Sequence, residues 1–105
     1  MTAYRLTDTA RRRLNEILDY SISRWGERRA EAYLRDIDQT LDALIRKKRR
    51  ARPGEQYGAG LSFIRCGSHY IFLRYDAASD MYEVVDVLHQ SMDLRRHLKA
   101  PPEGE

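Results

Sequence analysis

The chain has 105 residues and a formal net charge of +3, from 19 Lys and Arg against 16 Asp and Glu, a length that fits one compact domain and leaves little room for two. Its sequence holds no apolar run near the roughly 20 residues of a membrane helix, its N-terminus lacks the apolar segment of a signal peptide, and the single cysteine, Cys66, excludes an internal disulfide. We therefore expect one cytoplasmic domain over residues 1–105, ordered from about residue 3 to residue 99.

The N-terminal segment predicts a short strand followed by a helix. Residues 3–6 (AYRL) alternate small or apolar with polar side chains, as a strand does, and Thr7 opens a run of three good N-cap residues. Gly26 is the expected end of the helix. Between them, small and apolar residues recur at three- and four-residue steps and share one helical face: Ala10, Leu14, Ile17, Leu18, Ser21 and Trp25.

A second helix is expected to begin at about Glu27 and to run for about 22 residues, or roughly 33 Å. Because one short link joins the two amphipathic helices, they should form an antiparallel hairpin. The apolar face of this hairpin must cover the segments that follow it. In the second helix that face consists of Ala30, Tyr33, Leu34, Ile37, Leu41, Leu44 and Ile45.

Six cations fill seven positions from Arg46 to Arg52. Such a run can attract phosphate groups or an acidic protein partner, and the attraction falls as salt rises. Alternatively, it is a solvated helix end whose cations complement the C-terminal dipole. The sequence leaves both interpretations open.

Turn signals divide the second half of the chain into strands. Pro53-Gly54 and the Gly-Ala-Gly of residues 58–60 mark a loop. The nearly continuous apolar centre Val84–Leu88 predicts a central strand that is covered on both faces. Three strands are expected, separated by Gly67-Ser68 and by the polar turn 76–80: residues 61–66, 69–75 and 81–89.

After the last strand, Asp93 is expected to cap a short helical turn in which Leu94 and Leu98 share a face, and Pro101-Pro102 is expected to end the ordered chain. The element order is β-α-α-β-β-β-α. It predicts an α+β fold: an N-terminal strand, an antiparallel helical hairpin packed on a mostly antiparallel four-stranded sheet, and a short C-terminal helix.

The residue pattern predicts neither a metal site nor a cofactor. The three histidines, His69, His89 and His97, show no HxxxH spacing, and Cys66 has no thiol partner nearby. Residues 58–60 precede a strand, whereas a phosphate-binding glycine loop opens a helix. Since Cys66 lies inside a strand pattern, a small buried apolar side chain is favoured over a nucleophile.

General acid–base chemistry is the serious enzymatic alternative. The unperturbed pKa of a histidine side chain, about 6.5, lies near cytoplasmic pH, and His89 and His97 are the histidines of the closing segment. Together with Arg65, Arg74, Arg95 and Arg96 they could form a site for RNA cleavage, in which cations hold phosphate while a base activates the 2′-hydroxyl.

The structural alternative is that His89 ends a strand and hydrogen-bonds the 90–93 turn, while His97 is an exposed cation at a helix end. This second interpretation is favoured, because no carboxylate or tyrosine is clearly placed to complete a proton relay.

Three segments together resemble the ParE-type toxins of the ParE/RelE superfamily. The first is the TxxAxxxLxxIxxY pattern from Thr7 to Tyr20, with Trp25-Gly26 and Ala32-Tyr33 after it. The second is residues 65–75, RCGSHYIFLRY, and the third is VLHQSMD with HL from Val87 to Leu98. The resemblance covers roughly residues 4 to 98, and the closing segment is its specific part.

The resemblance implies a bacterial toxin of a type II toxin–antitoxin system, neutralised by a cognate ParD-like antitoxin. For ParE members it implies inhibition of DNA gyrase by binding, with no catalytic residue of their own. The RelE branch instead cleaves mRNA on the ribosome and usually uses a tyrosine near the C-terminus. This sequence departs from that pattern, because the only tyrosine past Met81 is Tyr82.

Two sets of contact residues follow from these expectations. A gyrase-binding surface would use the basic sheet edge and the C-terminal turn: Arg65, Arg74, His89, Arg95, Arg96 and His97. Under the nuclease alternative the site would be His89, Arg65, Arg74 and His97, acting on mRNA at the ribosome. A disordered antitoxin segment folding over the hairpin would contact Tyr4, Leu18, Trp25, Tyr33, Arg46 and Arg49. For Leu18 and Trp25, ordinary packing inside the hairpin is the favoured alternative.

Overall fold

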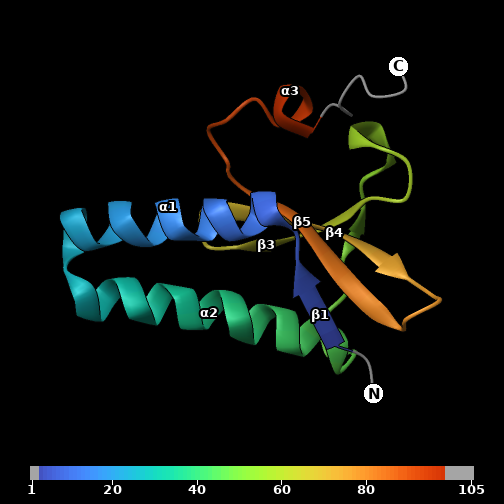
Figure 1. Ribbon diagram of the computed structural model, residues 1–105, viewed down its shortest axis with the longest axis horizontal. Helices are drawn as coiled ribbons and strands as arrows, with labels where there is room; N and C mark the ends of the chain where they lie inside the picture. The colour runs from blue at the N-terminus through green and yellow to red at the C-terminus, as the bar shows by residue number, and fades with distance from the viewer. Residues whose placement is uncertain (1–2, 99–105) are drawn as a thin grey trace.

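The computed structural model describes residues 3–98 (Figure 1). The expected α+β fold is confirmed, with a helical hairpin against one sheet and a short helix near the C-terminal end of the described chain. The expectations for Pro101-Pro102 and for the limit of order at residue 99 lie outside the described residues. The elements are β1 (Ala3–Leu6), α1 (Asp8–Trp25), α2 (Glu27–Ile45), β2 (Arg52–Pro53), the 3-10 helix η1 (Glu55–Tyr57), β3 (Ser62–Cys66), β4 (His69–Asp76), β5 (Met81–His89) and α3 (Leu94–Leu98).

The hairpin forms from the local signals of its ends. Thr7 caps α1, because its Oγ1 accepts a hydrogen bond from the backbone N–H of Ala10 at 3.0 Å. Gly26 ends α1 with φ +91°, a backbone conformation that residues with a Cβ rarely adopt, and α2 begins at the next residue. The one-residue link turns the chain back on itself, so the two helices run antiparallel (Figure 1).

The second helix is shorter than expected, and the sheet has one strand more. Helix α2 ends at Ile45, and Lys47 takes a left-handed φ of +63°. In a helix, the cations of this run that stand three or four residues apart would face and repel one another. Most of the basic run therefore leaves the helix. Its last member, Arg52, begins the two-residue strand β2, which pairs with β3 where a loop was expected.

The five-stranded sheet has the order β1-β5-β4-β3-β2. Strand β1 runs parallel to β5, and the other neighbours pair antiparallel. The hairpin covers one face of this sheet (Figure 1). The core between them is apolar and buried: Ala10, Ile37, Leu41, Leu44, Ile64, Cys66, Ile71, Leu73, Val84 and Val87. The prediction of Cys66 as a small buried side chain is thereby confirmed.

A β-bulge at Val85 changes which side chains of β5 face the helices. Phe72 pairs with Asp86 and Leu73 pairs with Val84, so β5 has one residue more than β4 at this point. Val84 and Val87 consequently both belong to the core under the hairpin, although strict alternation would put them on opposite faces.

The other face of the sheet is covered by aromatic side chains. Phe72 and Leu88 are fully buried on this face, so the expectation that Val84–Leu88 is covered on both sides is confirmed. Tyr57 of η1 contacts Phe63 and Phe72 edge to face, and Phe63 contacts Tyr70 in the same way. Such pairs bury large apolar areas with specific geometry. The element α3 lies beside η1.

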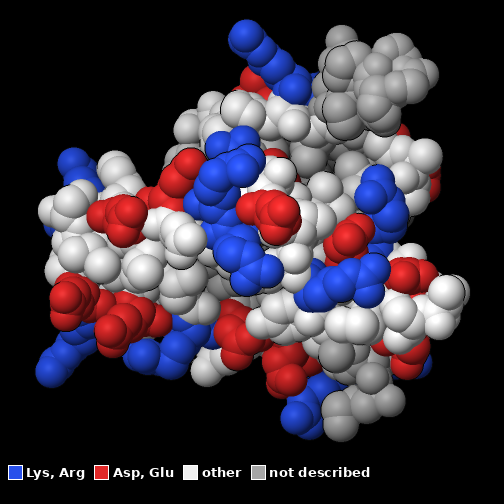
Figure 2. Space-filling view, in the orientation of Figure 1, with Lys and Arg blue, Asp and Glu red and all other residues white. Residues whose placement is uncertain are grey.

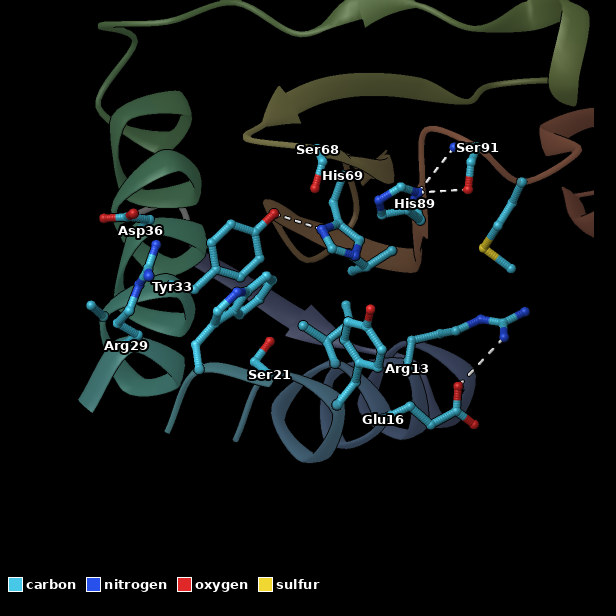
Figure 3. Close-up of a pocket in the computed structure, with 16 residues that line it drawn as sticks. Arg13, Glu16, Ser21, Arg29, Tyr33, Asp36, Ser68, His69, His89 and Ser91 are labelled. Carbon is cyan, nitrogen blue, oxygen red and sulfur yellow. Dashed lines mark hydrogen bonds and ion pairs between the residues drawn. The ribbon is translucent and has the colours of Figure 1, made fainter. Parts of the chain in front are cut away.

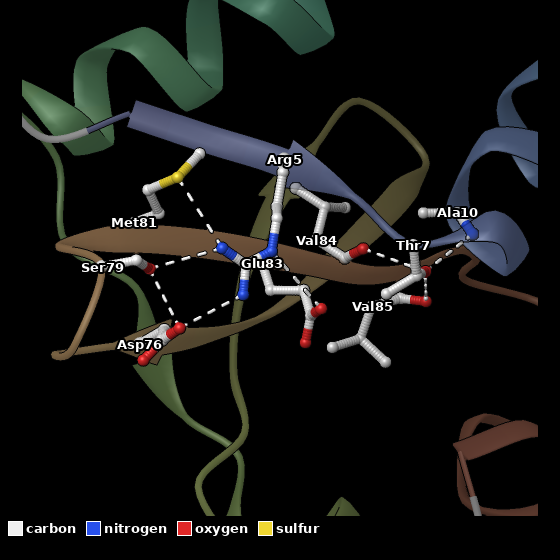
Figure 4. A network of polar contacts seen from close by, with 9 residues as sticks. All are labelled: Arg5, Thr7, Ala10, Asp76, Ser79, Met81, Glu83, Val84 and Val85. Carbon is white, nitrogen blue, oxygen red and sulfur yellow. Dashed lines mark hydrogen bonds and ion pairs between the residues drawn. The ribbon is translucent and has the colours of Figure 1, made fainter.

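A polar network joins β1 to the turn between β4 and β5 (Figure 4). The Arg5 guanidinium lies 3.2 Å from an Asp76 carboxylate oxygen and 3.7 Å from Glu83. It also donates to the Ser79 hydroxyl at 3.3 Å. The ionised form of Asp76 is favoured by the hydrogen bonds from Ser79 and then from Arg5, which lower the pKa of its carboxyl.

Candidate functional site

An open cavity of about 800 Å³ lies between the hairpin and the end of the β4–β5 ladder where β4 begins (Figure 3). Its walls come from α1, α2 and the two strand ends. Aromatic and imidazole side chains make up much of the lining, with hydroxyl groups and two arginines around them. The lining includes Tyr20, Trp25, Tyr33, His69, His89 and Met92.

Tyr33 of α2 fixes the ring of His69. The Tyr33 hydroxyl lies 2.6 Å from His69 Nδ1 and donates to the Cys66 carbonyl at 2.9 Å. While the hydroxyl proton serves that carbonyl, the hydrogen bond to the imidazole is donated by the Nδ1–H of His69. Burial is the main cause that raises the pKa of Tyr33, so its phenol stays protonated at neutral pH.

His89 ends β5 and fastens the turn that follows it. Its Nδ1 accepts from the Ser91 backbone N–H at 3.0 Å and lies 2.8 Å from the Ser91 hydroxyl. Its carbonyl accepts from the Met92 N–H at 2.9 Å. The structural interpretation of His89, in which it hydrogen-bonds the 90–93 turn, is confirmed.

Strand pairing places the two histidines directly opposite each other. His69 pairs with His89 in the β4–β5 register, and their ring centroids are 5.1 Å apart with the planes nearly perpendicular. Burial, and secondarily His89, lowers the pKa of His69 from 6.5 to about 4. His69 is therefore neutral at physiological pH and can accept a proton or a ligand on a free ring nitrogen.

Arg65 and Arg74 lie on the opposite face of the sheet from this cavity. Arg65 stands between two core residues of β3, and its guanidinium carbon lies 5.9 Å from the centre of the Tyr70 ring. It also donates to the Gly67 carbonyl at 2.9 Å and to the Gln90 side chain at 2.8 Å. Arg74 is exposed further along β4, where it lies opposite Glu83 in the β4–β5 register.

The basic residues of α3 are displayed at the surface. Arg95 and Arg96 are exposed, and the Arg96 N–H receives the expected cap from Asp93 at 3.3 Å. His97 is exposed and its Nδ1 lies 3.3 Å from a guanidinium nitrogen of Arg13. The same arginine bonds the buried Asp86 at 3.0 Å, so Arg13 joins α1 to β5 and α3.

Two arginines of the basic run after α2, Arg46 and Arg49, make different contacts. Arg46 pairs with Asp42 one helical turn earlier at 2.9 Å, at the exposed helix end. Arg49 reaches across to β3 and donates to the Arg65 carbonyl at 3.3 Å. On the face shown in Figure 2, cations gather over the middle of the molecule with carboxylates beside them, so the two signs are interspersed there.

Within residues 3–98, no group of three or more His, Cys, Asp and Glu side chains is arranged to hold a metal ion. None of the helices described in this part of the chain is long and apolar enough to cross a membrane.

Comparison with known proteins decides the family. A profile described as "ParE toxin of type II toxin-antitoxin system, parDE" matches residues 4–94. The chain belongs to the ParE toxin family. Toxin ParE1 of Caulobacter vibrioides is 36% identical over 98 residues, covering 93% of this chain and 99% of that protein. Toxin ParE1 of Mycobacterium tuberculosis is also 36% identical, over 95 residues, covering 90% of this chain and 96% of that protein.

Two solved structures share the fold of this ParE toxin. One, described as "Chromosomal ParDE TA system from P. aeruginosa", has a TM-score of 0.69 at 17% identity and covers 85% of this chain and 95% of that one. The other is the toxin–antitoxin complex RelBE2 from Mycobacterium tuberculosis, with a TM-score of 0.57 at 22% identity, covering 83% and 95%. The ParE/RelE-like fold predicted from the sequence is confirmed.

In this ParE toxin the residues named for antitoxin contact fall into three places. Trp25 and Tyr33 line the cavity, whereas the Tyr4 hydroxyl lies 2.5 Å from Asp38, further along α2. Leu18 is half-buried on α1. Arg46 and Arg49 lie beyond the end of α2. The preference for Trp25 as packed hairpin core was wrong: Trp25 is 49% exposed at the end of α1, where its ring contacts Tyr20 edge to face and the Arg29 guanidinium.

The contribution of His69 to a site in this ParE toxin was missed from the sequence. In the sequence it is an isolated histidine without the spacing of a metal ligand. The sequence does not reveal the register of β4 and β5, which places His69 opposite His89. That register depends on the two-residue turn at Gly67-Ser68 and on the bulge at Val85.

Proposed function

We propose that this ParE-family toxin inhibits DNA gyrase by binding to it, and that a cognate ParD-like antitoxin neutralises it. The observation that carries the proposal is the family match over residues 4–94, which spans both helices of the hairpin and all of the sheet except Ala3. The relatives named Toxin ParE1 and the solved ParDE system support the toxin–antitoxin part of the proposal.

The geometry of the cations supports binding over cleavage. Arg65 and Arg74 lie on the face of the sheet opposite to His89, so these three side chains do not surround one scissile bond. Arg95 and Arg96 are exposed and free to meet an acidic surface of a partner. Exposed cations of this kind steer association and set orientation.

The experiment for gyrase uses purified toxin, gyrase and relaxed plasmid. Toxin in excess should block supercoiling or accumulate cleaved DNA. The double variant Arg95→Ala/Arg96→Ala should need roughly tenfold more toxin, which corresponds to about 1.4 kcal/mol of binding free energy. The matched control is Arg11→Ala/Arg12→Ala, an exposed arginine pair on α1, which should inhibit like the parent chain. Supercoiling that is unimpaired at excess toxin would refute the proposal.

The second candidate function is ribosome-dependent mRNA cleavage. One observation favours it: the open cavity brings together a phenol and two imidazoles, Tyr33, His69 and His89, which are side chains able to move protons. Under this alternative, mRNA should be cut in toxin-arrested cells, and His89→Ala should slow cleavage roughly 100-fold. Transcripts that stay intact during arrest would remove it.

Neutralisation by an antitoxin is supported by the shape of the helix side of the molecule. The cavity carries the exposed ring of Trp25 and the half-buried ring of Tyr33, and large aromatics in such grooves anchor folding segments. Arg46 and Arg49 could meet acidic residues of the same segment. Reversing both charges to Glu should slow association and flatten its dependence on salt, with Arg11→Glu/Arg12→Glu as the control. An unchanged rate would restrict the antitoxin surface to the cavity.

A further inference from the structure

We propose that the cavity between the hairpin and the β4–β5 ladder is a binding site for an uncharged nucleobase of the adenine type, which has an N–H donor beside a ring-nitrogen acceptor. His69, His89 and Ser21 hold the edge of the base, and aromatic side chains of α1 stack on its face. The site is independent of the proposed action on gyrase, and either could hold without the other.

Three polar atoms of the cavity wall have no hydrogen-bond partner among residues 3–98: Nε2 of His69, Nε2 of His89 and Oγ of Ser21. Ser21 is only 2% exposed, and both imidazoles are half-buried. No side-chain nitrogen or oxygen of a non-exposed residue in this part of the chain is both shielded from solvent and unpaired. The three atoms therefore remain accessible, and the space that their side chains line is the cavity. Polar groups that converge on a largely apolar cavity are typical of a ligand site.

The two imidazoles offer one donor and one acceptor. Nδ1 of His89 accepts from the Ser91 N–H at 3.0 Å, so Nε2 of this ring carries the hydrogen and donates. Nδ1 of His69 donates to the Tyr33 hydroxyl at 2.6 Å, so Nε2 of this neutral ring keeps its lone pair. The rings lie opposite each other in the β4–β5 register with centroids 5.1 Å apart, so one ligand edge can reach both.

This donor–acceptor pair selects uncharged ligands. A carboxylate has no hydrogen to give to His69, and an ammonium or guanidinium group has no lone pair for His89. Adenine has both functions, because its N6 amine stands beside the N7 acceptor. The Ser21 hydroxyl can donate or accept, so it can meet a further polar atom of the base. The charges of the lining also suit a neutral ligand, because its two arginines are matched by two carboxylates.

Two exposed aromatic rings of α1 favour a flat ligand over a simple amide. Tyr20 is 58% exposed and Trp25 is 49% exposed, and both line the cavity. A base stacks on the faces of such rings, whereas an amide group alone would leave them uncovered. In Figure 3 the Ser21 hydroxyl points from the same helix toward the strand ends that carry the histidines. The cavity volume of about 800 Å³ lies in the range of small-molecule sites.

Titrating adenosine into the purified toxin tests the site. Trp25 is the single tryptophan, so a base stacked in the cavity should change its fluorescence saturably. The matched ligand is purine riboside, which keeps the ring and N7 but lacks the N6 amine. It should bind at least tenfold more weakly, because His69 then receives no hydrogen bond. No saturable binding of adenosine, or equal affinity for the two nucleosides, would overturn the proposal.

A pair of serine variants separates binding from folding. Ser21→Ala removes a hydroxyl without a partner in the described chain, so it should weaken adenosine binding roughly fivefold and leave the midpoint of thermal unfolding unchanged. Ser23→Ala should bind like the parent chain, because its hydroxyl donates to the Tyr20 carbonyl at 2.9 Å and does not line the cavity. His69→Phe keeps a ring without a lone pair and should weaken binding at least tenfold. Unchanged binding in either Ser21→Ala or His69→Phe would contradict the assignment.

A measurement on the unaltered chain avoids any question of folding. With ¹⁵N-labelled imidazoles, adenosine should shift the Nε2 resonances of His69 and His89 together. The resonances of His97, which is exposed on α3, should stay in place. Shifts centred on His97, or none at His69 and His89, would refute the site.

Two sources can supply such a base: a free nucleoside and an unpaired base of a nucleic acid strand. If a strand is the source, a short single-stranded oligoadenylate should bind more tightly than adenosine, and its affinity should fall with salt. If the nucleoside is the source, the oligoadenylate should bind no better. All titrations use toxin without antitoxin, because the antitoxin proposed for the same cavity would compete. Their failure would leave the supercoiling and antitoxin association assays unaffected.

Discussion

The two ends of the β4–β5 ladder are built differently. At the turn 77–80, Arg5 ties β1 to Asp76 and Glu83 (Figure 4). The Tyr75 hydroxyl bonds Asp80 at 2.7 Å. At the opposite end, His69 and His89 line an open cavity (Figure 3). Their Nδ1 atoms are hydrogen-bonded to the Tyr33 hydroxyl and to the Ser91 N–H, respectively. The closed end uses exposed ion pairs, whereas the open end uses partly buried imidazole and phenol groups.

The difference indicates where function can reside on this hairpin. Exposed ion pairs contribute little to the free energy of unfolding because water and salt screen both charges. Substitutions at the closed end should therefore cost little stability. At the open end, partly buried polar groups are costly to leave unpaired, and each histidine ring has a partner at its Nδ1. A ligand that enters the cavity therefore meets side chains already held in position.

The largest effect is expected at Arg13, the residue that joins α1 to the open end. Arg13→Ala would leave the Asp86 carboxylate, which is 3% exposed, buried without its guanidinium partner. We expect a loss of about 2–3 kcal/mol in the free energy of unfolding, at the low end for a broken buried pair because Arg13 is partly exposed. Urea denaturation measures it. Arg12→Ala, one residue away and exposed, should cost little, and an equal loss in both would remove the buried pair as the cause.

Gly67→Ala should break the turn behind His69. Gly67 has φ +58°, and a Cβ built there would lie 2.9 Å from the Tyr33 ring. The backbone strain alone is worth about 1–2 kcal/mol, and the clash should also displace Tyr33 from His69. Gly26→Ala is the matched control, because its φ is +91° but nothing lies within 4 Å of the added Cβ. Only the Gly67 variant should alter the imidazole NMR signals of His69; a similar change in both would contradict this account.

The pH dependence of stability should reveal the buried imidazole. The pKa of His69 is lowered by burial to about 4 in the folded chain, while the unfolded chain binds this proton near pH 6.5. Because the unfolded state binds more protons between these values, stability should be level above pH 6.5, fall as the pH drops toward 4, and change no further from this group below 4. Urea denaturation from pH 4 to pH 8 should show a shallower fall in His69→Gln, with His97→Gln matching the parent chain.

The smallest effect is expected at the closed end. Arg5→Gln removes the cation from the Asp76 carboxyl, whose pKa is lowered by Ser79 first and Arg5 second. The stabilisation from this carboxylate is present above its unfolded pKa and is lost as the pH falls through the folded value. The variant should therefore differ slightly from the parent chain at neutral pH and low salt, and less at high salt. A larger loss than that of Arg13→Ala would reverse the comparison of the two ends.

Local signals were enough to predict most of the fold. Thr7 and Gly26 mark the limits of α1, and Gly67-Ser68 and Asp93 mark a turn and a helix start. Each signal acts within a few residues of the chain, so it can be read before the fold is known. The end of α2 was misplaced because the run from Arg46 to Arg52 contains good helix formers, and their mutual repulsion opposes the intrinsic preference.

The site depended on contacts that no local pattern contains. His69 meets Tyr33 across the layer between helix and sheet, and His89 across the ladder. The sequence predicted His89 as a turn fastener because its partner Ser91 is two residues away. It predicted the strand pair 69–75 and 81–89, but the register of that pair depends on packing. The place of Arg13 between Asp86 and His97 is likewise a product of tertiary structure.

The bulge at Val85 shifts by one residue which side chains of β5 face the helices. Before it, Val84 points to the helices; after it, Val87 does, and so does His89. If the same residues paired in regular alternation without the bulge, the last part of β5 would present Asp86 and Leu88 to the hairpin and would turn His89 to the aromatic face. Because Val85 is left out of the pairing, His69 and His89 lie on the same face of the sheet and not on opposite faces.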